Sequence, residues 1–547
     1  MDVSFTEQSR AIASANVSDA VTPRHTPVSW RQAICLPLGF VVGLLLIGML
    51  NPVRQNPRLL WSFVATSLIL AIWSVAVIER ARRTHRQLTL DIVLRKQHYL
   101  QACAQGSVLL YWGWYWTRVY ESAYLIAAQL LFAYAFDLLL SWSRRDSYSL
   151  GFAPFPVIFS INLFLWFRPE WFFLQFLMVA VGFAAKDLIR WDKDGRRTHI
   201  FNPSSFPLAL FSLALIMTGM SDATFGREIA ITQFFPPHIY LFLFLIGLPG
   251  QYFFGVTTMT MSAAVTTYVF GLLYFAVTGT YFFYDSYIPV AVFLGMHLLF
   301  TDPSTSPRTE LGRIMFGVAY GLSTVLLYRL LSLADVPAFY DKLLQVPLLN
   351  LSIKGIDRVA RSSWLRVVDP ARIAQSLALR QRHLAYIGVW IIVFGIMSAV
   401  QGVGDNHRGQ WVPFWQRACA ENRAGACDYL ALTESNYCDA GSGWACNAFA
   451  ILQTKRDVPG PGAGESFGAG CQAGFSAACE NRARLYAGRS GVLTDAAPTL
   501  HDYAILVRGS KATAGEGSPA SIYSRACGQG WRDACDRTGS SAARGAE

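Results

Sequence analysis

Eight of the ten cysteines lie after residue 418, and they form four pairs whose members are eight residues apart. Pairing of this kind could bind zinc or form disulfides. The region has one histidine, His501, and lacks the gap of two to four residues that zinc knuckles use. We therefore expect four disulfides, which indicate an oxidising compartment. The pairs are Cys419 and Cys427, Cys438 and Cys446, Cys471 and Cys479, and Cys527 and Cys535.

Each pair also carries the signals of a tight turn between two helices. Alanine precedes the second cysteine of every pair, and the third residue after the first cysteine is Asn422, Gly441, Gly474 or Gly530. Asn and Gly tolerate the left-handed backbone that ends a helix. The pattern resembles the cysteine-rich Sel1-like repeats, whose two-helix units stack into a solenoid that commonly binds proteins. The resemblance covers about 415–540 and implies insertions at 458–470 and 487–520.

A motif outside this region carries polar groups where a hydrophobic run begins. HIFNPSSFPLAL spans 199–210, and Asn202 with Pro203 suits the cap and first turn of a helix. Ser204 and Ser205 would then leave hydroxyls and backbone amides free at the positive end of the helix dipole, where an anion or a carbonyl-bearing ring can bind. A capped helix start without a ligand explains the same residues.

A second motif, FTDPSTSPRTELGRIMFG, spans 300–317 between two hydrophobic runs. Thr301, Asp302 and Pro303 have the chemistry of a turn, and the next helix is predicted to begin near Gly312. Taken singly, this motif predicts only a turn.

Histidines near the ends of hydrophobic runs are candidate haem ligands, because imidazoles from two helices can bind haem iron. They are His199, His238 and His297. Nothing fixes their mutual distance, and a lone histidine near a membrane interface is more often a hydrogen-bonded structural residue. No phosphate-binding loop, dinucleotide fingerprint or nucleophile elbow is present. The run YWGWYW (111–116) fits an interfacial aromatic belt better than a cofactor stack.

A membrane bundle must position these residues. Of the 547 residues, 53% are hydrophobic and 15% are charged, and runs such as 36–50 and 59–78 are long enough to cross a bilayer. We predict further spans near 107–117, 122–141, 151–167, 170–186, 206–220, 238–256, 260–281, 287–300, 314–332 and 384–402.

The net charge of +11 is concentrated in loops between these spans. Clusters of Lys and Arg occupy 80–96, 186–197 and 354–382, and the positive-inside rule assigns such loops to the cytoplasm. A nucleic-acid surface explains the charge less well, because hydrophobic spans separate the clusters. We therefore expect no nucleic-acid partner.

This orientation requires one more crossing before the last span, and 335–353 is the candidate. Asp341 and Lys342 within it must face protein or water. The predicted fold class is all-α: a polytopic helical membrane bundle of about 10–12 spans, followed by an extracytoplasmic, disulfide-tied helical-repeat region. The predicted organisation is a polar arm at 1–32, a transmembrane domain at 33–353, a basic cytoplasmic linker at 354–383, a last transmembrane helix at 384–403 and the repeat region at 404–547.

Together, the Asn202 and Asp302 motifs resemble those of the RnfD/NqrB family of membrane subunits. Members carry an FNPA-type motif and, further on, a TDPVT-type motif followed by a stretch similar to the GRIMFG found here. The resemblance covers about 120–360 and extends to UnbU-type relatives associated with enediyne biosynthesis, which share the HIFNPS form. It implies a membrane flavoprotein of an ion-translocating electron-transport complex.

Members of the family carry FMN joined through its phosphate to a threonine hydroxyl in an S-x-A-T motif on the outer face. Ser221 to Thr224 match this motif, and the predicted topology puts Thr224 outside. This chain departs from the family at Asp222, Phe225 and Gly226, and the four residues equally suit an ordinary interfacial turn. The resemblance implies FMN or another flavin as cofactor, with binding residues Thr224, Ser221, Asn202, Pro203, Thr301, Asp302 and Pro303.

The expected function is that of an electron-transfer subunit in the bacterial cytoplasmic membrane, with its C-terminus outside. The repeats would dock other subunits or a periplasmic redox protein, and any enzyme activity depends on partners that supply the electron donor and acceptor. The alternative is a flavin-free scaffold or small-molecule transporter on the same fold, whose repeat region does the recognising.

Overall fold

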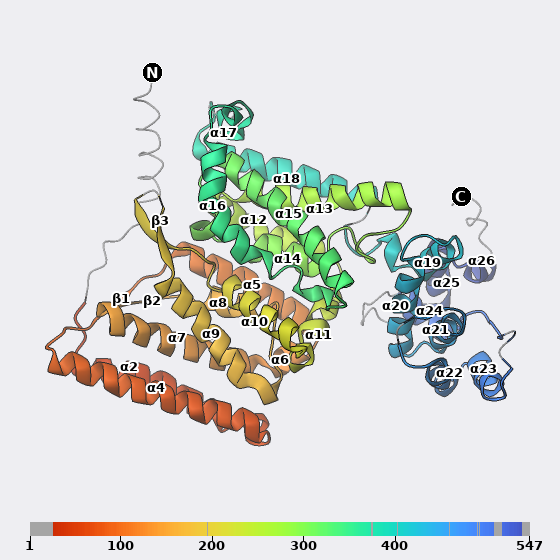
Figure 1. Ribbon diagram of the computed structural model, residues 1–547, viewed down its shortest axis with the longest axis horizontal. Coiled ribbons are helices and arrows are strands. Elements are labelled where there is room, and N and C mark those ends of the chain that lie inside the picture. Colours follow the sequence, from red (N-terminus) through yellow and green to blue (C-terminus); the bar gives the residue numbers. More distant parts are fainter. Residues whose placement is uncertain are drawn as a thin grey trace. The chain divides into compact units, whose positions relative to one another are not determined.

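The structure, a computed structural model, describes residues 26–538 apart from 194, 374–375, 402, 459, 490, 492 and 508–516. Residues 1–25 of the predicted N-terminal arm lie outside the described residues. About 72% of the chain is helical, which confirms the predicted helical class. Two small two-stranded sheets were not predicted. The chain divides into two compact units, whose elements are labelled in Figure 1.

The first unit comprises the residues up to Ala102 together with Tyr124–Ile158 and Pro169–Ala184. Its helices α2 and α4 lie side by side (Figure 1). Ser29 caps α2, and Asn56 caps α4 by accepting a hydrogen bond from the Leu59 amide. The elements in or entering this unit are α2 (Trp30–Gly48), α3 (Asn51–Arg54), α4 (Pro57–Arg83), β1 (Thr89–Ile92), α5 (Lys96–Tyr115), α7 (Ala123–Arg145), β2 (Ser147–Leu150), α8 (Pro154–Asn162), η1 (Pro169–Trp171) and α9 (Phe172–Leu188).

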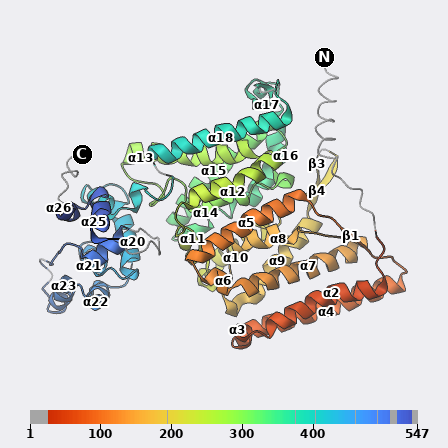
Figure 2. The ribbon, with the colours of Figure 1, turned by 180° about the vertical axis from the view of Figure 1, so that it is seen from behind.

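The second unit comprises Cys103–Ala123, Phe159–Arg168 and the chain from Ala185 onward. Its helices α13 and α15 lie side by side (Figure 2). Its elements before the cysteine-rich region are α6 (Arg118–Glu121), β3 (Arg190–Lys193), β4 (Arg196–His199), α10 (Ser205–Thr218), η2 (Ser221–Ala223), α11 (Gly226–Thr232), α12 (Ile239–Phe254), α13 (Thr257–Thr278), α14 (Val290–Leu298), η3 (Pro303–Thr305), α15 (Glu310–Leu333), η4 (Ala338–Tyr340), α16 (Gln345–Ala360), η5 (Leu365–Val368), α17 (Pro370–Ile373) and α18 (Leu379–Gln401).

Seven helices within the described residues are long and apolar enough to cross a membrane. They carry exposed apolar side chains: Leu68, Ile69 and Ile72 of α4 are 59%, 64% and 61% exposed. Such a surface is unfavourable in water and matches a lipid environment. The chain is thus a multi-pass membrane protein, with fewer long spans than the 10–12 predicted.

The spans predicted at 151–167 and 287–300 contain the nine-residue helices α8 and α14, followed by buried irregular backbone. Neighbouring chain segments satisfy this backbone. Phe225 donates its amide to the Trp166 carbonyl at 2.8 Å, and Gln105 donates its side-chain amide to the Leu298 carbonyl at 3.1 Å. Irregular backbone at membrane depth is tolerated where protein supplies such partners, and hydropathy alone does not distinguish these segments from full spans.

The four predicted disulfides are present, with Cα–Cα distances of 4.6–4.7 Å. Asn422, Gly441, Gly474 and Gly530 adopt positive φ in the turns between the bonded helices, as predicted. α20 carries both Cys427 and Cys438, so the first two disulfide units share a helix. The elements after the last long span are η6 (Arg408–Gln410), α19 (Val412–Ala420), α20 (Ala426–Asp439), α21 (Gly443–Lys455), α22 (Ala463–Gln472), α23 (Ser476–Tyr486), α24 (Leu500–Leu506), α25 (Pro519–Gly528) and α26 (Arg532–Thr538).

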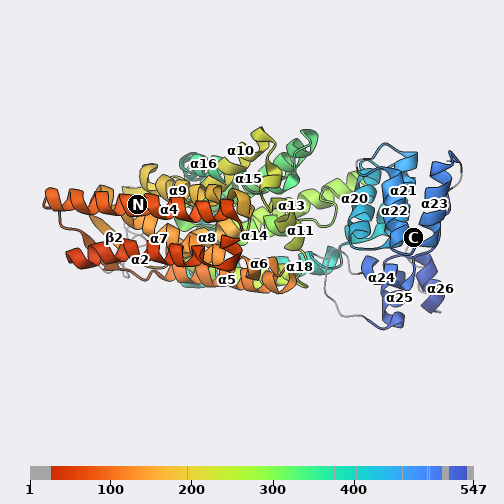
Figure 3. The same cartoon turned by 90° about the horizontal axis from the view of Figure 1, so that it is seen from below.

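Helices α20 to α23 pack in sequence order (Figure 3). Asn481 of α23 donates a 2.8 Å hydrogen bond to Asn447 of α21, 34 residues earlier. The fourth disulfide unit instead packs Trp531 against Trp444 of α21, with ring centroids 4.9 Å apart. Stacking is therefore not regular along the tail, but the insertion predicted at 458–470 was wrong for 463–470, which belong to α22.

The first disulfide unit docks on the loop between α13 and α14. Arg423 donates to the Gly279 carbonyl at 2.7 Å, and Tyr429 donates to the Phe282 carbonyl at 3.0 Å. The buried ring of Tyr281 lies 4.2 Å from that of His407 and 4.8 Å from that of Phe414. This part of the tail is therefore anchored to the membrane domain rather than tethered by a free linker.

We expect alkylation of the denatured, unreduced protein to label two thiols, Cys35 and Cys103, which are the two free cysteines. Reduction should expose the other eight cysteines. Intact-mass counting of labels measures both results. More than two reactive thiols before reduction would contradict the assignment.

Replacing Cys438 and Cys446 together by serine should lower the free energy of unfolding of the repeat region by about 2–3 kcal/mol, because the loop is short.

The docking loop also predicts a pH dependence. Burial raises the pKa of the Asp285 carboxyl to about 6, against hydrogen bonds from Ser286 and Tyr284. Because the pKa of this carboxyl is higher in the folded than in the unfolded protein, its protonated form favours the folded state. This contribution to stability is fully present below the unfolded pKa of 3.8 and is lost as pH rises through about 6. We expect Asp285→Asn to raise the unfolding temperature near pH 7.5 and to leave it unchanged near pH 4. The exposed Asp428→Asn is the control, and equal pH slopes for all three proteins would refute the prediction.

Candidate functional site

The side chain of Asn202 joins two helix ends. It is 4% exposed, and its Oδ1 accepts hydrogen bonds from the amides of Ser204 at 2.9 Å and Ser205 at 3.1 Å, at the start of α10. Its Nδ2 donates to the carbonyl of Leu299, which follows α14, at 3.0 Å. Asn202 thus caps one helix while bonding to the end of another.

The donors that we expected to be free at the start of α10 are occupied. Asn202 Oδ1 binds both serine amides and also accepts the Ser204 hydroxyl at 2.7 Å. Asn202 caps the helix, as predicted, whereas Pro203 precedes the first turn because α10 begins at Ser205. The expectation of free donors for an anion or carbonyl was therefore wrong, and the capped-start interpretation holds.

The second motif lies beside the first. Asp302 caps η3 because its carboxylate accepts a hydrogen bond from the Ser304 amide at 3.0 Å, and Pro303 is the first residue of that turn. His199, at the end of β4, lies 3.3 Å from Asp302 Oδ2. Thr301 donates its hydroxyl to the His297 carbonyl at 3.0 Å. The predicted turn is confirmed, and the structure brings the Asn202 and Asp302 motifs together.

Three residues without an assigned role in the predicted site complete this junction. Asn350 of α16 accepts from the Asn202 amide at 3.2 Å and donates to the Thr305 carbonyl at 3.2 Å. Lys193 of β3 donates to the Ser306 carbonyl at 2.6 Å. Asp357 of α16 accepts from the Arg308 amide at 2.9 Å, at the start of α15. Isolated polar residues in an otherwise apolar segment are the signal that could have identified Asn350.

We call the cluster of Asn202, Asp302, Asn350 and Asp357 the Asn202 junction. None of these four described side chains has a buried polar atom without a partner. Burial alone would raise the pKa of the Asp302 carboxyl, but His199, Ser304 and Thr305 lower it below the usual 3.8. The junction holds α10, α14, α15 and α16 in register, and its hydrogen bonds are internal.

Ser221 and Thr224 lie at the opposite end of α10. The helix has 14 residues, so about 21 Å separate its ends. The seven residues predicted to bind one flavin therefore form two separate sets, and one bound flavin does not contact both.

Thr224 is 2% exposed. Its hydroxyl donates to the Ser221 carbonyl at 2.9 Å and accepts from the Gly226 amide at 3.2 Å. Its backbone bridges to Phe167, in the irregular segment after α8. The geometry is that of a closed turn, which matches the alternative interpretation of the SDAT residues.

Aromatic and cationic side chains surround this turn. Phe225 lies between Arg118 and Arg168, whose guanidinium carbons are 4.8 and 4.6 Å from its ring centre. Trp166 approaches Phe225 edge-on at 6.5 Å and stacks on Trp116 at 5.5 Å. Trp112, fully buried, completes a three-tryptophan cluster. The belt prediction for 111–116 was therefore wrong for buried Trp112 and stays a prediction for Trp114, which is exposed.

The segment predicted as an additional span contacts both ends of α10. Tyr340 donates to the Ser221 hydroxyl at 3.0 Å, whereas Asn350 binds at the Asn202 end. The segment is not one continuous helix: η4 and an irregular stretch precede α16, which begins at Gln345. Asp341 and Lys342 face protein, as predicted, with 3.8 Å between their charged atoms.

The structure does not gather the three candidate haem ligands. His199 pairs with Asp302, His297 lies within α14, and the His238 side chain is 79% exposed. Among the described residues, no group of three or more His, Cys, Asp or Glu side chains could hold a metal ion.

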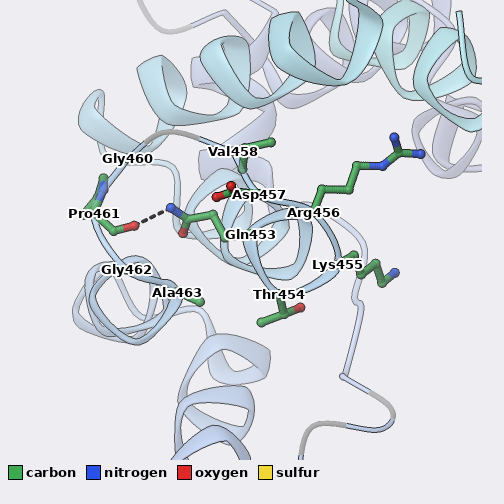
Figure 4. Close-up of a pocket in the computed structure, with 10 residues that line it drawn as sticks. All are labelled: Gln453, Thr454, Lys455, Arg456, Asp457, Val458, Gly460, Pro461, Gly462 and Ala463. Carbon is green, nitrogen blue, oxygen red and sulfur yellow. Dashed lines mark hydrogen bonds between the residues drawn. The ribbon is translucent and has the colours of Figure 1, made fainter.

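An open pocket of about 510 Å³ lies at the end of α21 (Figure 4). Its lining runs from Gln453 to Val458 and from Gly460 to Ala463. Gln453 bonds to the Pro461 carbonyl across it, and the Lys455 and Arg456 side chains extend outward. None of the predicted cofactor residues lines this pocket, whose lining includes polar and basic side chains.

Comparisons with family models, curated proteins and solved structures found no match for this chain.

The Asn202 junction predicts different outcomes for two replacements of Asp302. Asp302→Asn keeps the cap acceptor and should cost less than about 1 kcal/mol near neutral pH, whereas Asp302→Ala should cost about 1–2 kcal/mol. Because the Asp302 pKa is lowered on folding, its charge stabilises above the unfolded pKa and is lost as pH falls through the folded value. Thermal unfolding in detergent across acidic pH measures both effects. Equal destabilisation by the two variants would refute the capping role.

Proposed function

We propose that this protein is a membrane-embedded electron-transfer subunit similar to RnfD/NqrB proteins, with a flavin at the Thr224 end of α10. Its resemblance to that family rests on the Asn202, Asp302 and SDAT motifs. One observation supports the choice of end: the Thr224 turn lies against stacked tryptophans and two arginines.

The arginines suit the phosphate of FMN, and the tryptophans suit its isoalloxazine ring. Arginine binds phosphate oxygens through charge-assisted hydrogen bonds, and the Arg168 side chain is 39% exposed. Aromatic faces stack on a planar ring such as isoalloxazine. Arg168 is itself ion-paired with Glu228 at 2.7 Å, so phosphate binding would exchange that partner. At the Asn202 end, Lys193 is buried and bonded to Ser306.

Attachment requires the Thr224 turn to open. Its hydroxyl must leave the Ser221 carbonyl and the Gly226 amide before its oxygen can attack the FMN phosphorus of a flavin dinucleotide, where it displaces the nucleoside monophosphate and gives up its proton. Arg168 also releases contacts in this opening, because its amide binds the Ala223 carbonyl at 2.9 Å and its Nε binds the Asp222 carbonyl at 2.8 Å. The closed turn thus represents the protein before modification.

The repeat region has a separate role in the proposal. We propose that α21 to α23 present a docking surface for another subunit or a periplasmic redox protein, because the first disulfide unit is occupied by its contacts with the membrane domain. The basic side chains beside the α21 pocket would favour an acidic partner segment.

A second candidate function is a flavin-free membrane scaffold or small-molecule transporter. The buried, doubly hydrogen-bonded Thr224 hydroxyl favours this alternative, since a closed structural turn needs no cofactor. The presence of bound flavin separates the two functions.

Co-expression with a flavin transferase tests the proposal. We expect one FMN mass adduct and in-gel fluorescence in the wild type, loss of both in Thr224→Ala, and retention in Thr218→Ala. Thr218 is a matched control because it lies at the same end of α10, with its hydroxyl bonded within the helix. A folded protein without an adduct, or an adduct that persists in Thr224→Ala, would overturn the proposal and leave the scaffold.

A further inference from the structure

Six buried polar atoms without a hydrogen-bond partner lie where α12, α14 and α18 pack together. We call this group the polar seam; the three helices can be followed in Figure 2. Within the part of the chain that the structure describes, these atoms are Nε2 and Oε1 of Gln251, Nε2 of His297, Nε1 of Trp390, the hydroxyl of Tyr386 and Nε of Arg382.

Residue spacing places these groups along helix faces that meet. Arg382, Tyr386 and Trp390 are four residues apart and share one face of α18. A Cβ built on Gly247 of α12 would lie 2.7 Å from His297 Cδ2 and 3.2 Å from Gln251 Nε2, so both side chains face one point. The ring of His297 lies 6.2 Å from that of Trp390.

The ends of the seam differ. At one end, a Cβ on Gly255 would lie 2.9 Å from His383, and Arg313 binds the Gly255 carbonyl at 2.6 Å and Glu310 at 2.8 Å. At the other end, the rings of Phe244 and Phe394 stack at 4.0 Å. One end is therefore lined by charges, while the other is closed by hydrocarbon.

The hydrogen-bonding character of these groups specifies what satisfies them. His297 Nδ1 lies 2.8 Å from the Phe293 carbonyl, so Nδ1 carries the hydrogen and Nε2 is an acceptor. Trp390 only donates, whereas the Gln251 amide does both. The occupant must therefore both donate and accept hydrogen bonds. A ring that offers only carbonyl acceptors leaves His297 Nε2 unsatisfied, but water satisfies all three groups.

Leaving such atoms dry is costly. A buried polar group without a partner destabilises the fold because it has lost its hydration, and these three are enclosed: His297 is 2%, Gln251 1% and Trp390 0% exposed. Polar side chains inside membrane proteins face water-filled interiors or one another. Buried water commonly satisfies groups of this kind.

We propose that the polar seam is a hydrated half-channel that enters from the Glu310–Arg313 end and stops at His297, below the Phe244–Phe394 stack. Water along it delivers a proton to His297 Nε2: the proton leaves a hydronium, which becomes water, and the imidazole becomes imidazolium. Release occurs through the same nitrogen, because Nδ1 is bonded to the Phe293 carbonyl. The chain thus contains a proton-loading position reached from one side, independent of any flavin.

Radiolytic hydroxyl-radical footprinting of the full chain in nanodiscs tests the hydration. Bound water labels neighbouring side chains even when bulk solvent does not reach them. Trp112 and Trp142 are matched controls, being 0% and 1% exposed with their indole nitrogens bonded to protein. We expect Trp390 to be labelled about fivefold or more faster than either control. Equal rates for the three tryptophans would overturn the proposal.

Two variants extend the test. Gln251→Leu should return Trp390 labelling to the control rate, while unchanged Trp112 labelling shows that the fold is intact. Phe394→Ala should open the closed end and make proteoliposomes leak protons, and adding His297→Phe should abolish that leak; His501→Phe, at an exposed tail position, should not. Absence of a leak in a folded Phe394→Ala protein, or its persistence without His297, would overturn the half-channel.

Discussion

Polar groups enclosed by apolar helices have to find their partners within the protein, and the fold of this chain depends on how Asn202 meets that requirement. Its carboxamide binds the first amides of α10 and the carbonyl that follows α14, and its own amide binds Asn350. A hydrophobic residue at this position would leave several of these backbone groups unpaired where water is scarce. Through its side chain and its backbone amide together, Asn202 therefore fixes the relation of three chain segments.

The interrupted helices follow from the same constraint. α8 and α14 are too short to cross a bilayer, and the buried backbone that continues them is bonded by Gln105, Asn202 and Phe225. Discontinuous helices are commonly used where membrane proteins place functional sites. Here each adjoins one end of α10: the backbone after α14 meets the saturated junction at the Asn202 end, and the backbone after α8 meets the turn flanked by aromatic and cationic side chains at the Thr224 end.

Local chemistry explains which features were predictable from the sequence. The disulfide pairs and left-handed turns were predicted because cysteine spacing and Gly or Asn at a helix end carry strong local constraints. The occupied donors of Ser204 and Ser205 were missed because these groups were expected to stay free, although Asn202 was placed at the cap, from which its side chain accepts such amides. The contact between Asn202 and Asn350 spans 148 residues, so the local sequence marks Asn350 as a polar residue but gives no indication of its partner. Span lengths were overestimated where irregular backbone is as hydrophobic as a helix.

The central claim is that the Asn202 junction acts as one cooperative unit that positions the ends of α10, α14 and α16. A double-mutant cycle with Asn202→Ala and Asn350→Ala, measured by unfolding in mixed micelles, tests it most directly. Residues of one hydrogen-bond network couple, so the account predicts an interaction energy of about 1 kcal/mol or more. Additive effects, within about 0.3 kcal/mol, would show that the two side chains act independently and would contradict the claim.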